Sequence, residues 1–197
     1  MAIGIVNYGL AGNIYNIRKA LIEAGAKVKV IDHKNDFLLV KKIVIPGVGS
    51  FKDAIKELED KNLINSIKNF EGEILGICLG MQILCEEGYE FGKTNGLGFF
   101  NAKVEVLKER SILPHMGFKE VDFSEDEALF KGLDKKSQFY FMHSYEVISK
   151  KNVLASATYE KRSITAALKK DNVYGVQFHP EKSREQGIHL FKNFINL

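Results

Sequence analysis

Cys78 is the residue whose setting most clearly suggests chemistry. It stands in Gly76-Ile77-Cys78-Leu79-Gly80, directly after the apolar run 73–77 and before a helix-compatible stretch. A strand, a sharp turn and a helix in this order form a nucleophile elbow, in which the two glycines let strand and helix approach closely. The N-terminus of the following helix stabilises a thiolate. A buried structural cysteine is the alternative, and Cys85, which follows two apolar residues, fits that interpretation better.

A nucleophilic thiol needs a base and a group that orients the base, and the best candidates are His179 and Glu181. Both belong to Gln177-Phe178-His179-Pro180-Glu181, which follows a strand-like run. At the end of a strand both side chains can emerge toward the elbow, and Pro180 restricts the backbone between them. We therefore expect a catalytic pair, although a structural histidine would be the better interpretation of a lone His179.

Two other histidines have less suggestive settings. His143 lies in an aromatic strand-like run, 140–145, and is expected to be a core or pocket-wall residue and not a second base. His115 follows Pro114, in what we expect to be a loop with a structural or interfacial role.

The negative charge of a tetrahedral intermediate requires backbone N–H donors. Leu79, immediately after the nucleophile, offers one donor. The segment Pro46-Gly47-Val48-Gly49-Ser50 is the second source, because it follows a neighbouring strand and its glycines permit unusual backbone angles. A plain strand-to-helix turn is the alternative interpretation. Phosphate binding is a weaker one, because the segment lacks the Gly-Lys-Ser/Thr ending of a P-loop.

The elements that must position these residues alternate in the first half of the chain. The predicted strands are 3–6, 27–31, 42–45 and 73–77, and the predicted helices are 13–24 and 51–70. We expect Asn13 to cap the first helix and Gly25 to end it. This alternation favours a parallel sheet covered by helices on both faces.

The second half consists mainly of strand-like runs. They are 97–107, 118–123, 139–145, 153–159, 164–168 and 173–178, followed by a closing helix at 183–197. Asp171-Asn172, between the last two runs, predicts a tight hairpin turn. With no repeat, low-complexity stretch or linker, we expect one domain over residues 1–197.

Composition limits the function without naming it. The 197 residues are 45% hydrophobic and 27% charged, which is typical of a globular protein. The net charge of +3 is too small to indicate nucleic-acid binding, and no apolar run reaches the roughly 18 residues that span a membrane. Two cysteines form neither a disulfide framework nor a metal site, and no export signal precedes the first strand. We expect a cytoplasmic protein without a metal or cofactor.

Three motifs occur in one chain order: Pro-Gly-Val-Gly at 46–49, Gly-Ile-Cys-Leu-Gly-Met-Gln at 76–82 and His-Pro-Glu at 179–181. This set resembles the class I, triad-type glutamine amidotransferases. The segments 46–51, 114–117, 140–145 and 177–183 are similar to those of the glutaminase subunit of imidazole glycerol phosphate synthase. The resemblance spans nearly the whole chain. It implies an α/β fold, a flavodoxin-like three-layer sandwich with a mostly parallel central sheet and an antiparallel extension.

The resemblance also implies residue roles. Cys78 would attack the side-chain amide of glutamine, His179 would pass a proton to the departing ammonia, and Glu181 would orient His179. Water would then hydrolyse the glutamyl thioester. The other matched positions are the oxyanion residues Val48 and Gly49 beside Leu79, the substrate-binding residues Gln82, Glu90, His143 and Ser144, and the interface residues Phe118, Lys119, Tyr140 and Lys182.

In that family the ammonia passes to a (β/α)8-barrel cyclase subunit. The cyclase forms imidazole glycerol phosphate and an aminoimidazole carboxamide ribotide in histidine biosynthesis. Because 197 residues leave no room for a barrel of about 250 residues, the resemblance implies a heterodimer with a separate barrel chain.

Two departures from the family pattern affect the expected partner-facing surface and spare the triad. The family usually has Asp-Tyr-Gly-x-Gly-Asn where this chain has Asn-Tyr-Gly-Leu-Ala-Gly-Asn at 7–13, and Trp-Asn where this chain has Phe118-Lys119. One alternative is therefore a paralogous glutaminase that supplies ammonia for acetamidino groups on surface sugars. Another is a non-catalytic binding module on the same fold.

Overall fold

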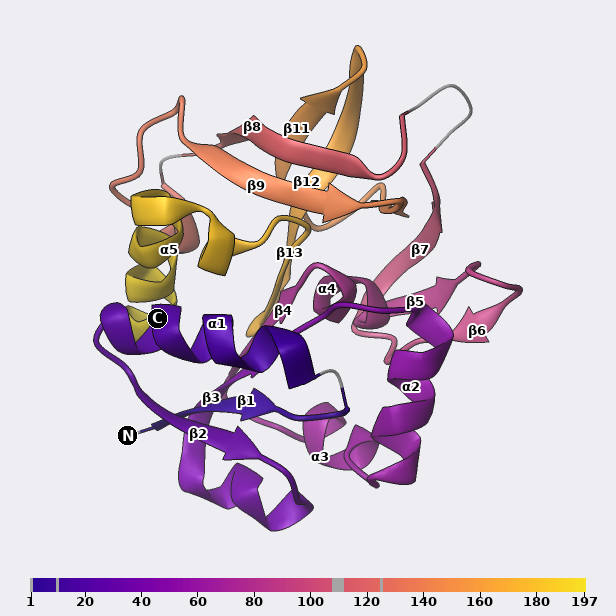
Figure 1. The fold of residues 1–197 in the computed structure, drawn as a ribbon, viewed down its shortest axis with the longest axis vertical. Coiled ribbons are helices and arrows are strands. Elements are labelled where there is room, and N and C mark those ends of the chain that lie inside the picture. The colour runs from indigo at the N-terminus through magenta and orange to yellow at the C-terminus, as the bar shows by residue number, and fades with distance from the viewer. Residues whose placement is uncertain (1, 10, 108–111, 125) are drawn as a thin grey trace.

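Strands from both halves of the chain join in one large mixed sheet (Figure 1). The computed structural model describes residues 2–9, 11–107, 112–124 and 126–197. Within them, a nine-stranded sheet has the order β2-β1-β3-β4-β13-β12-β11-β8-β9. Its strands are β1 (Ala2–Val6), β2 (Lys27–Ile31), β3 (Val40–Ile45), β4 (Glu73–Ile77), β8 (His115–Phe123), β9 (Gln138–His143), β11 (Val153–Tyr159), β12 (Arg162–Lys170) and β13 (Val173–Val176).

Pairing is parallel from β2 to β13 and antiparallel from β13 to β9, which confirms the predicted α/β fold with an antiparallel extension. The register aligns Ile45 with Gly76 and Val176 with Ile77. The carboxyl ends of β3, β4 and β13 therefore lie side by side. The three motifs of the sequence each follow one of these strand ends, so the sheet gathers them at one edge.

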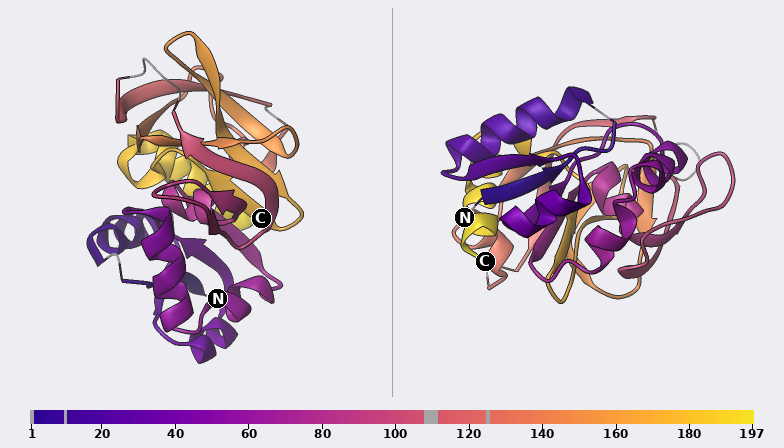
Figure 2. Two further views of the ribbon diagram at one scale, coloured as in Figure 1. Left: turned by 90° about the vertical axis from the view of Figure 1, so that its right-hand side faces the viewer. Right: turned by 90° about the horizontal axis from the view of Figure 1, so that it is seen from below.

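Helices cover both faces of the parallel part of the sheet, which gives three layers (Figure 2). On one face α1 (Ala11–Glu23) packs against α5 (Arg184–Asn196). The other face carries α2 (Phe51–Asp60), α3 (Ile64–Lys68) and α4 (Leu79–Ile83). Short 3-10 helices complete the helical part, at η1 (Lys34–Leu39), η2 (Ala128–Phe130) and η3 (Pro180–Lys182).

Two apolar cores fill the spaces between these layers. Ile43, Ile45 and Ile74 belong to the core under α2 and α3. Val44 and Leu75 belong to the core under α1 and α5. Because successive side chains of a strand point to opposite faces, strands buried on both sides have continuous apolar sequences.

A second, four-stranded sheet has the order β10-β7-β5-β6 within the described residues. Its strands are β5 (Cys85–Gly88), β6 (Thr94–Asn95), β7 (Phe100–Val106) and β10 (Tyr145–Ile148). Phe100, Ala102 and Val104 of β7 join the core under α2 and α3, so this sheet closes that side of the molecule.

Two predictions about the helices were wrong. The predicted helix 51–70 is two helices, because Asn62 adopts a left-handed conformation (φ +56°) that ends the first, and asparagine tolerates that region. The first helix begins at Ala11, so Asn13 lies inside it and is not its cap; Gly9, with φ +106°, makes the preceding turn. Gly25 ends this helix as predicted, with φ +99°, and Asp171-Asn172 forms the predicted hairpin between β12 and β13.

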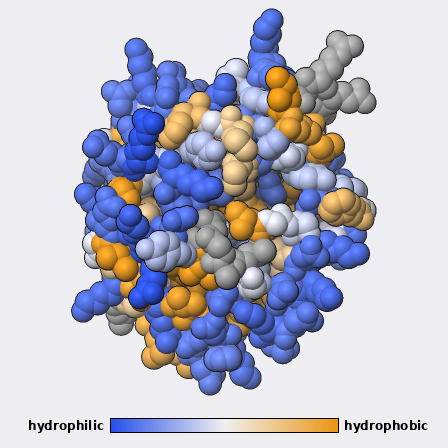
Figure 3. Space-filling view, viewed as in Figure 1, coloured by the Kyte–Doolittle hydropathy of each residue, from blue (hydrophilic) through white to orange (hydrophobic). Residues whose placement is uncertain are grey.

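Polar side chains cover most of the face seen in Figure 1, with apolar side chains in small separate groups (Figure 3). No helix among the described residues is long and apolar enough to cross a membrane.

Candidate active site

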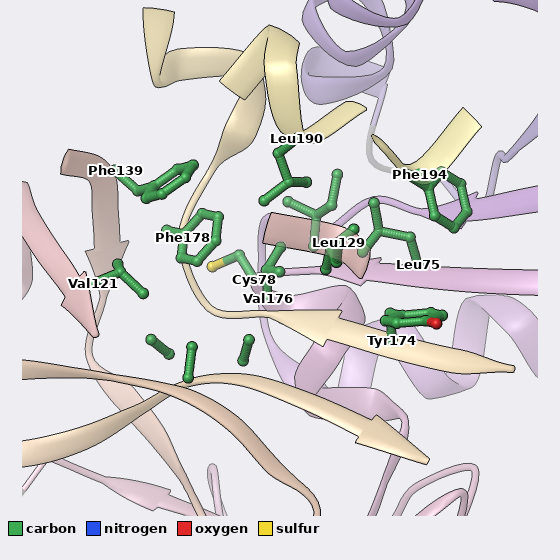
Figure 4. Close-up of a cluster of buried hydrophobic side chains, with 14 of the residues drawn as sticks. Leu75, Cys78, Val121, Leu129, Phe139, Tyr174, Val176, Phe178, Leu190 and Phe194 are labelled. Atoms are coloured by element: carbon green, nitrogen blue, oxygen red, sulfur yellow. The ribbon is translucent and has the colours of Figure 1, made fainter. Parts of the chain in front are cut away.

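The turn after β4 has the geometry of a nucleophile elbow. Cys78 has φ +54°, and its N–H donates to the carbonyl of Val176 at 2.7 Å. A Cβ atom on Gly76 would lie 2.6 Å from the carbonyl oxygen of Gly80, and one on Gly80 would lie 2.0 Å from that of Ile45. Glycine is therefore required on both sides of the cysteine, as predicted. Figure 4 shows Cys78 beside Phe178 and Val176, among the side chains of the apolar core under α1 and α5.

Cys78 borders a cavity of about 210 Å³. Eight predicted site residues meet there, and they are Val48, Gly49, Cys78, Leu79, Gln82, Glu90, His143 and Ser144. Gly47, which belongs to the predicted oxyanion segment, also lines it, as do Pro114, Met142 and Tyr145, for which no role was predicted. The cavity therefore joins segments from four distant parts of the chain around one thiol.

His179 and Glu181 lie buried outside the lining of this cavity. Nδ1 of His179 is 2.8 Å from Oε1 of Glu181, and both side chains are fully shielded from solvent. Because the carboxylate accepts a hydrogen bond from Nδ1, the other ring nitrogen, Nε2, is free for proton transfer. Nε2 has no hydrogen-bond partner within the described residues. Burial alone would lower the pKa of His179, but the neighbouring Cys78 and the hydrogen-bonded Glu181 carboxylate raise it to about 10.

Two buried amide side chains flank the thiol. Nε2 of Gln82 donates to the carbonyl of Tyr145 at 3.0 Å and to Oε1 of Gln177 at 3.1 Å. With both N–H groups used, Gln82 has only its oxygen left to accept a hydrogen bond from a ligand. Nε2 of Gln177 in turn donates to Sγ of Cys78 at 3.5 Å. Gln177 was not predicted as a site residue, although it directly precedes Phe178-His179.

Glu90 connects the cavity with the start of α2. Its Oε2 accepts a hydrogen bond from the N–H of Phe51 at 2.7 Å. A carboxylate at a helix N-terminus is stabilised by the free N–H groups there. The same carboxylate lines the cavity, where it can meet a positively charged ligand group.

His143 and His115 form a buried pair across β8 and β9. Nδ1 of His143 lies 2.8 Å from the carbonyl of Tyr145, so it carries the proton and Nε2 must accept. Nδ1 of His115, 3.0 Å away, is then the donor to that nitrogen. Burial lowers the pKa of His143 to about 3 and that of His115 to about 4, so both rings are neutral at pH 7. His143 is the predicted pocket-wall residue, whereas His115 begins strand β8 and does not lie in a loop.

The segment that contains Val48 and Gly49 packs closely against the nucleophile elbow. A Cβ atom on Gly47 would lie 2.3 Å from the backbone nitrogen of Gly80. Gly49 has φ +115° and is exposed. The buried hydroxyl of Tyr8 donates to the carbonyl of Pro46, which precedes the segment. Tyr8 was not predicted here, but the parallel pairing of β1 with β3 is the signal that brings the ends of both strands together.

Nearly the whole chain matches one family model. Residues 5–197 fit the model described as "Glutamine amidotransferase class-I". The chain belongs to this family of enzymes.

Similar class I glutamine amidotransferases carry a more specific name. "Imidazole glycerol phosphate synthase subunit HisH 1" of Campylobacter jejuni (strain RM1221) is 39% identical over 201 residues, covering 99% of this chain and all of that protein. The subunit HisH of Methanocaldococcus jannaschii is 40% identical and is matched over 99% of both chains. These names do not favour the surface-sugar alternative.

A solved structure supports the fold. The crystal structure of a glutamine amidotransferase superposes with a TM-score of 0.73 at 19% identity, over 100% of both chains. At that identity the likeness concerns the fold alone, and it agrees with the class I amidotransferase architecture.

The predicted interface residues of this amidotransferase do not form one group. Phe118 packs edge-on against Tyr140 with ring centroids 5.4 Å apart. Lys182 lies over the Tyr140 ring, and Arg184 lies 4.7 Å from the centre of the Phe118 ring. Lys119, one residue along the strand from Phe118, instead lies over Tyr159. Adjacent strand residues point to opposite faces, so Lys119 is separate from the other three.

The replacement of the family's acid by Asn7 has a structural reason. Nδ2 of Asn7 donates to Oδ1 of Asp32 at 2.7 Å. An aspartate at position 7 would bring two carboxylates together. Leu10, within the same departing segment, lies outside the described residues.

Two further features concern chemistry away from Cys78. The predicted core residue Cys85 is fully buried, and burial raises the pKa of its thiol. Among the residues that the structure describes, no three His, Cys, Asp or Glu side chains are grouped so that they could hold a metal ion.

Proposed function

We propose that this chain is the glutaminase subunit of an imidazole glycerol phosphate synthase. It hydrolyses glutamine to glutamate and ammonia through a thioester on Cys78. The ammonia then enters a separate (β/α)8-barrel cyclase subunit, which forms imidazole glycerol phosphate and an aminoimidazole carboxamide ribotide in histidine biosynthesis. As one domain over residues 1–197, it works in the cytoplasm as half of a heterodimer.

The observation that carries the proposal is the meeting of Cys78, Gln82 and Glu90 in one small cavity, with the His179–Glu181 pair buried behind it. The Gln82 oxygen suits an amide N–H, and the Glu90 carboxylate suits an α-ammonium group. Glutamine carries both groups, at opposite ends of a short chain. Ser144 and His143 complete the wall and contribute to its binding.

The first half of the reaction forms the thioester. Sγ of Cys78 bonds to the amide carbon of glutamine while its proton resides on Nε2 of His179. N–H groups of Val48, Gly49 and Leu79 stabilise the oxyanion. The intermediate then collapses, the carbon–nitrogen bond breaks, and the nitrogen leaves as ammonia with the proton from His179.

The second half releases glutamate. His179 takes a proton from water, and the hydroxide adds to the thioester carbonyl carbon. Breaking of the carbon–sulfur bond returns the sulfur to Cys78 and leaves the carboxyl group of glutamate. Glu181 keeps the imidazole oriented through both halves, because its oxygen holds Nδ1 at 2.8 Å.

The proposal is tested by separating ammonia production from ammonia use. In a complex with the barrel subunit, Cys78→Ala should abolish synthesis from glutamine and leave synthesis from added ammonium salt intact. Cys85→Ala, which removes the other thiol, is the matched control and should keep synthesis from glutamine. Glutamate release and formation of imidazole glycerol phosphate are both measured.

Glutamine-dependent synthesis by Cys78→Ala would contradict the mechanism. Glutaminase activity that supports only amidination of a surface sugar by its own barrel partner would contradict the histidine-pathway assignment and leave the mechanism standing.

A further inference from the structure

We propose that Tyr8 positions the oxyanion segment, residues 46–49, by holding the carbonyl of Pro46. The inference rests on the proposed function, since it concerns the geometry of glutamine hydrolysis. The Tyr8 side chain is only 1% exposed, and its hydroxyl donates to the Pro46 oxygen inside the core under α2. Tyr8 touches none of the reacting atoms, so it is a positioning residue.

The held carbonyl fixes the first peptide group of the oxyanion segment. A peptide group is planar, so fixing the oxygen of Pro46 also fixes the direction of the Gly47 N–H. Beyond it, two glycines with no Cβ flank Val48, and Gly49 has a positive φ. The Tyr8 hydrogen bond is therefore a fixed point at the start of a stretch that is otherwise conformationally permissive.

Tyr8 itself is firmly placed. The N–H of the preceding Asn7 donates to the carbonyl of Ile31 at 2.9 Å, and the Asn7 side chain binds Asp32. Nζ of Lys61 donates to the carbonyl of Asn7 at 2.8 Å. The anchor thus connects the end of β1 and the end of α2 with the oxyanion segment.

The hydroxyl acts as a donor and not as an acid or base. Burial, together with the nearby charge of Cys78, raises the pKa of the Tyr8 phenol. It therefore keeps its proton throughout the working pH range. Phenylalanine at this position would keep the ring in its apolar surroundings and would leave a buried carbonyl without its donor.

The kinetic test compares Tyr8→Phe with the wild-type chain in the complex with the barrel subunit. We expect kcat for glutamine hydrolysis to fall about tenfold, since a displaced oxyanion donor weakens stabilisation of the transition state. KM for glutamine should stay within about twofold, because Gln82 and Glu90 are untouched. Synthesis from ammonium salt should be unchanged.

Tyr159→Phe is the matched control, because the Tyr159 hydroxyl also donates to a main-chain carbonyl, that of Ile112, at 2.5 Å. We expect it to keep kcat. An unchanged kcat in Tyr8→Phe, or an equal loss in Tyr159→Phe, would overturn the inference.

A second measurement does not depend on activity. Amide hydrogen exchange of the peptide containing residues 47–51 should accelerate in Tyr8→Phe and not in Tyr159→Phe. If the wild-type complex hydrolysed no glutamine, the proposed function would fail, and this measurement would still decide whether Tyr8 holds the segment. Unchanged exchange in Tyr8→Phe would show that it does not.

Discussion

The charge of the His179 side chain is the residue-scale property that the proposed chemistry depends on most. Its pKa of about 10 means that the buried imidazole is protonated near pH 7. A protonated imidazole can deliver its proton to departing ammonia. Above the pKa this proton is lost, so the rate should decline on the alkaline side.

Glu181→Gln should move that alkaline decline to lower pH. The substitution keeps a hydrogen-bond acceptor near Nδ1 of His179 and removes the negative charge, which is one of the groups that raise its pKa. We expect kcat/KM to fall about 10²-fold as well, a loss typical of a weakened general acid–base group. Rates measured from pH 6 to about 10.5 in the complex test both effects. If the rate of Glu181→Gln declined at the same alkaline pH as that of the wild type, this role of Glu181 would be contradicted.

Asn7 provides a second residue-scale prediction, which concerns stability. Asn7→Asp should lower the free energy of unfolding by about 1 kcal/mol near pH 7, because a donor to Asp32 becomes a repelling carboxylate. Adding Asp32→Asn should restore most of the loss by returning a donor to the pair. Urea unfolding of both variants measures the effect. Equal stability of Asn7→Asp and the wild type would contradict it.

Residue types and local spacing were enough to predict Cys78, His179 and Glu181 as a possible catalytic set. Each of them stands in a short motif in which the adjacent residues already indicate its chemical role. Tyr8 and Gln177 were missed because their contacts depend on the sheet register. Tyr8 meets Pro46 only because β1 pairs with β3, and Gln177 meets Cys78 only because β13 pairs with β4.

At the scale of elements, the periodicity located most strands and helices correctly. It failed at 51–70 because apolar residues recur throughout this stretch, but those at 63, 64 and 67 lie on the opposite side of an ideal helix from those at 51, 55 and 58, and the break at Asn62 separates the two sets. It also could not place His115, since the first residue of a strand and the last residue of a loop look alike in sequence. The hydrogen-bond partner that shows His115 to be part of the strand, His143, lies 28 residues away in the sequence.

The His115–His143 pair connects β8 to β9 and should make the fold sensitive to acid. Both pKa values are lowered, to about 4 and about 3, so the unfolded chain binds protons more readily than the folded chain below about pH 6.5. The stabilisation from the neutral pair is therefore present above pH 6.5. It is lost as pH falls toward 3.

We expect the free energy of unfolding, measured by urea titration at each pH, to decline as the pH falls from 6.5 to about 4. His115→Phe removes one of the two titrating rings while it keeps an aromatic ring stacked on Phe141. Its decline over the same range should be shallower than that of the wild type. An identical slope would mean that His115 is not one of the groups responsible.

At the scale of the whole molecule, the sheet gathers the chemistry at one edge and leaves that edge uncovered. Leu113 and Met116, which are 42% and 57% exposed, lie within two residues of Pro114 at the cavity wall. Exposed apolar side chains beside a polar cavity are typical of an interaction site. The edge-on rings of Phe118 and Tyr140 and the neighbouring Arg184 guanidinium add aromatic groups and a charge of the kind enriched at interfaces.

This arrangement predicts that the chain alone hydrolyses glutamine slowly or not measurably. The proposed donors on Val48 and Gly49 lie in a permissive segment with an exposed Gly49, so we expect them to be poorly organised until the proposed barrel subunit covers this edge. Binding of the barrel with its nucleotide ligand should raise the rate of glutamate release about 10²-fold or more.

Met116→Lys should weaken this activation, whereas Leu38→Lys should not, because Leu38 is exposed near the opposite ends of the strands. Rapid hydrolysis by the chain alone would contradict gating by the partner, and equal activation of both lysine variants would place the interface elsewhere.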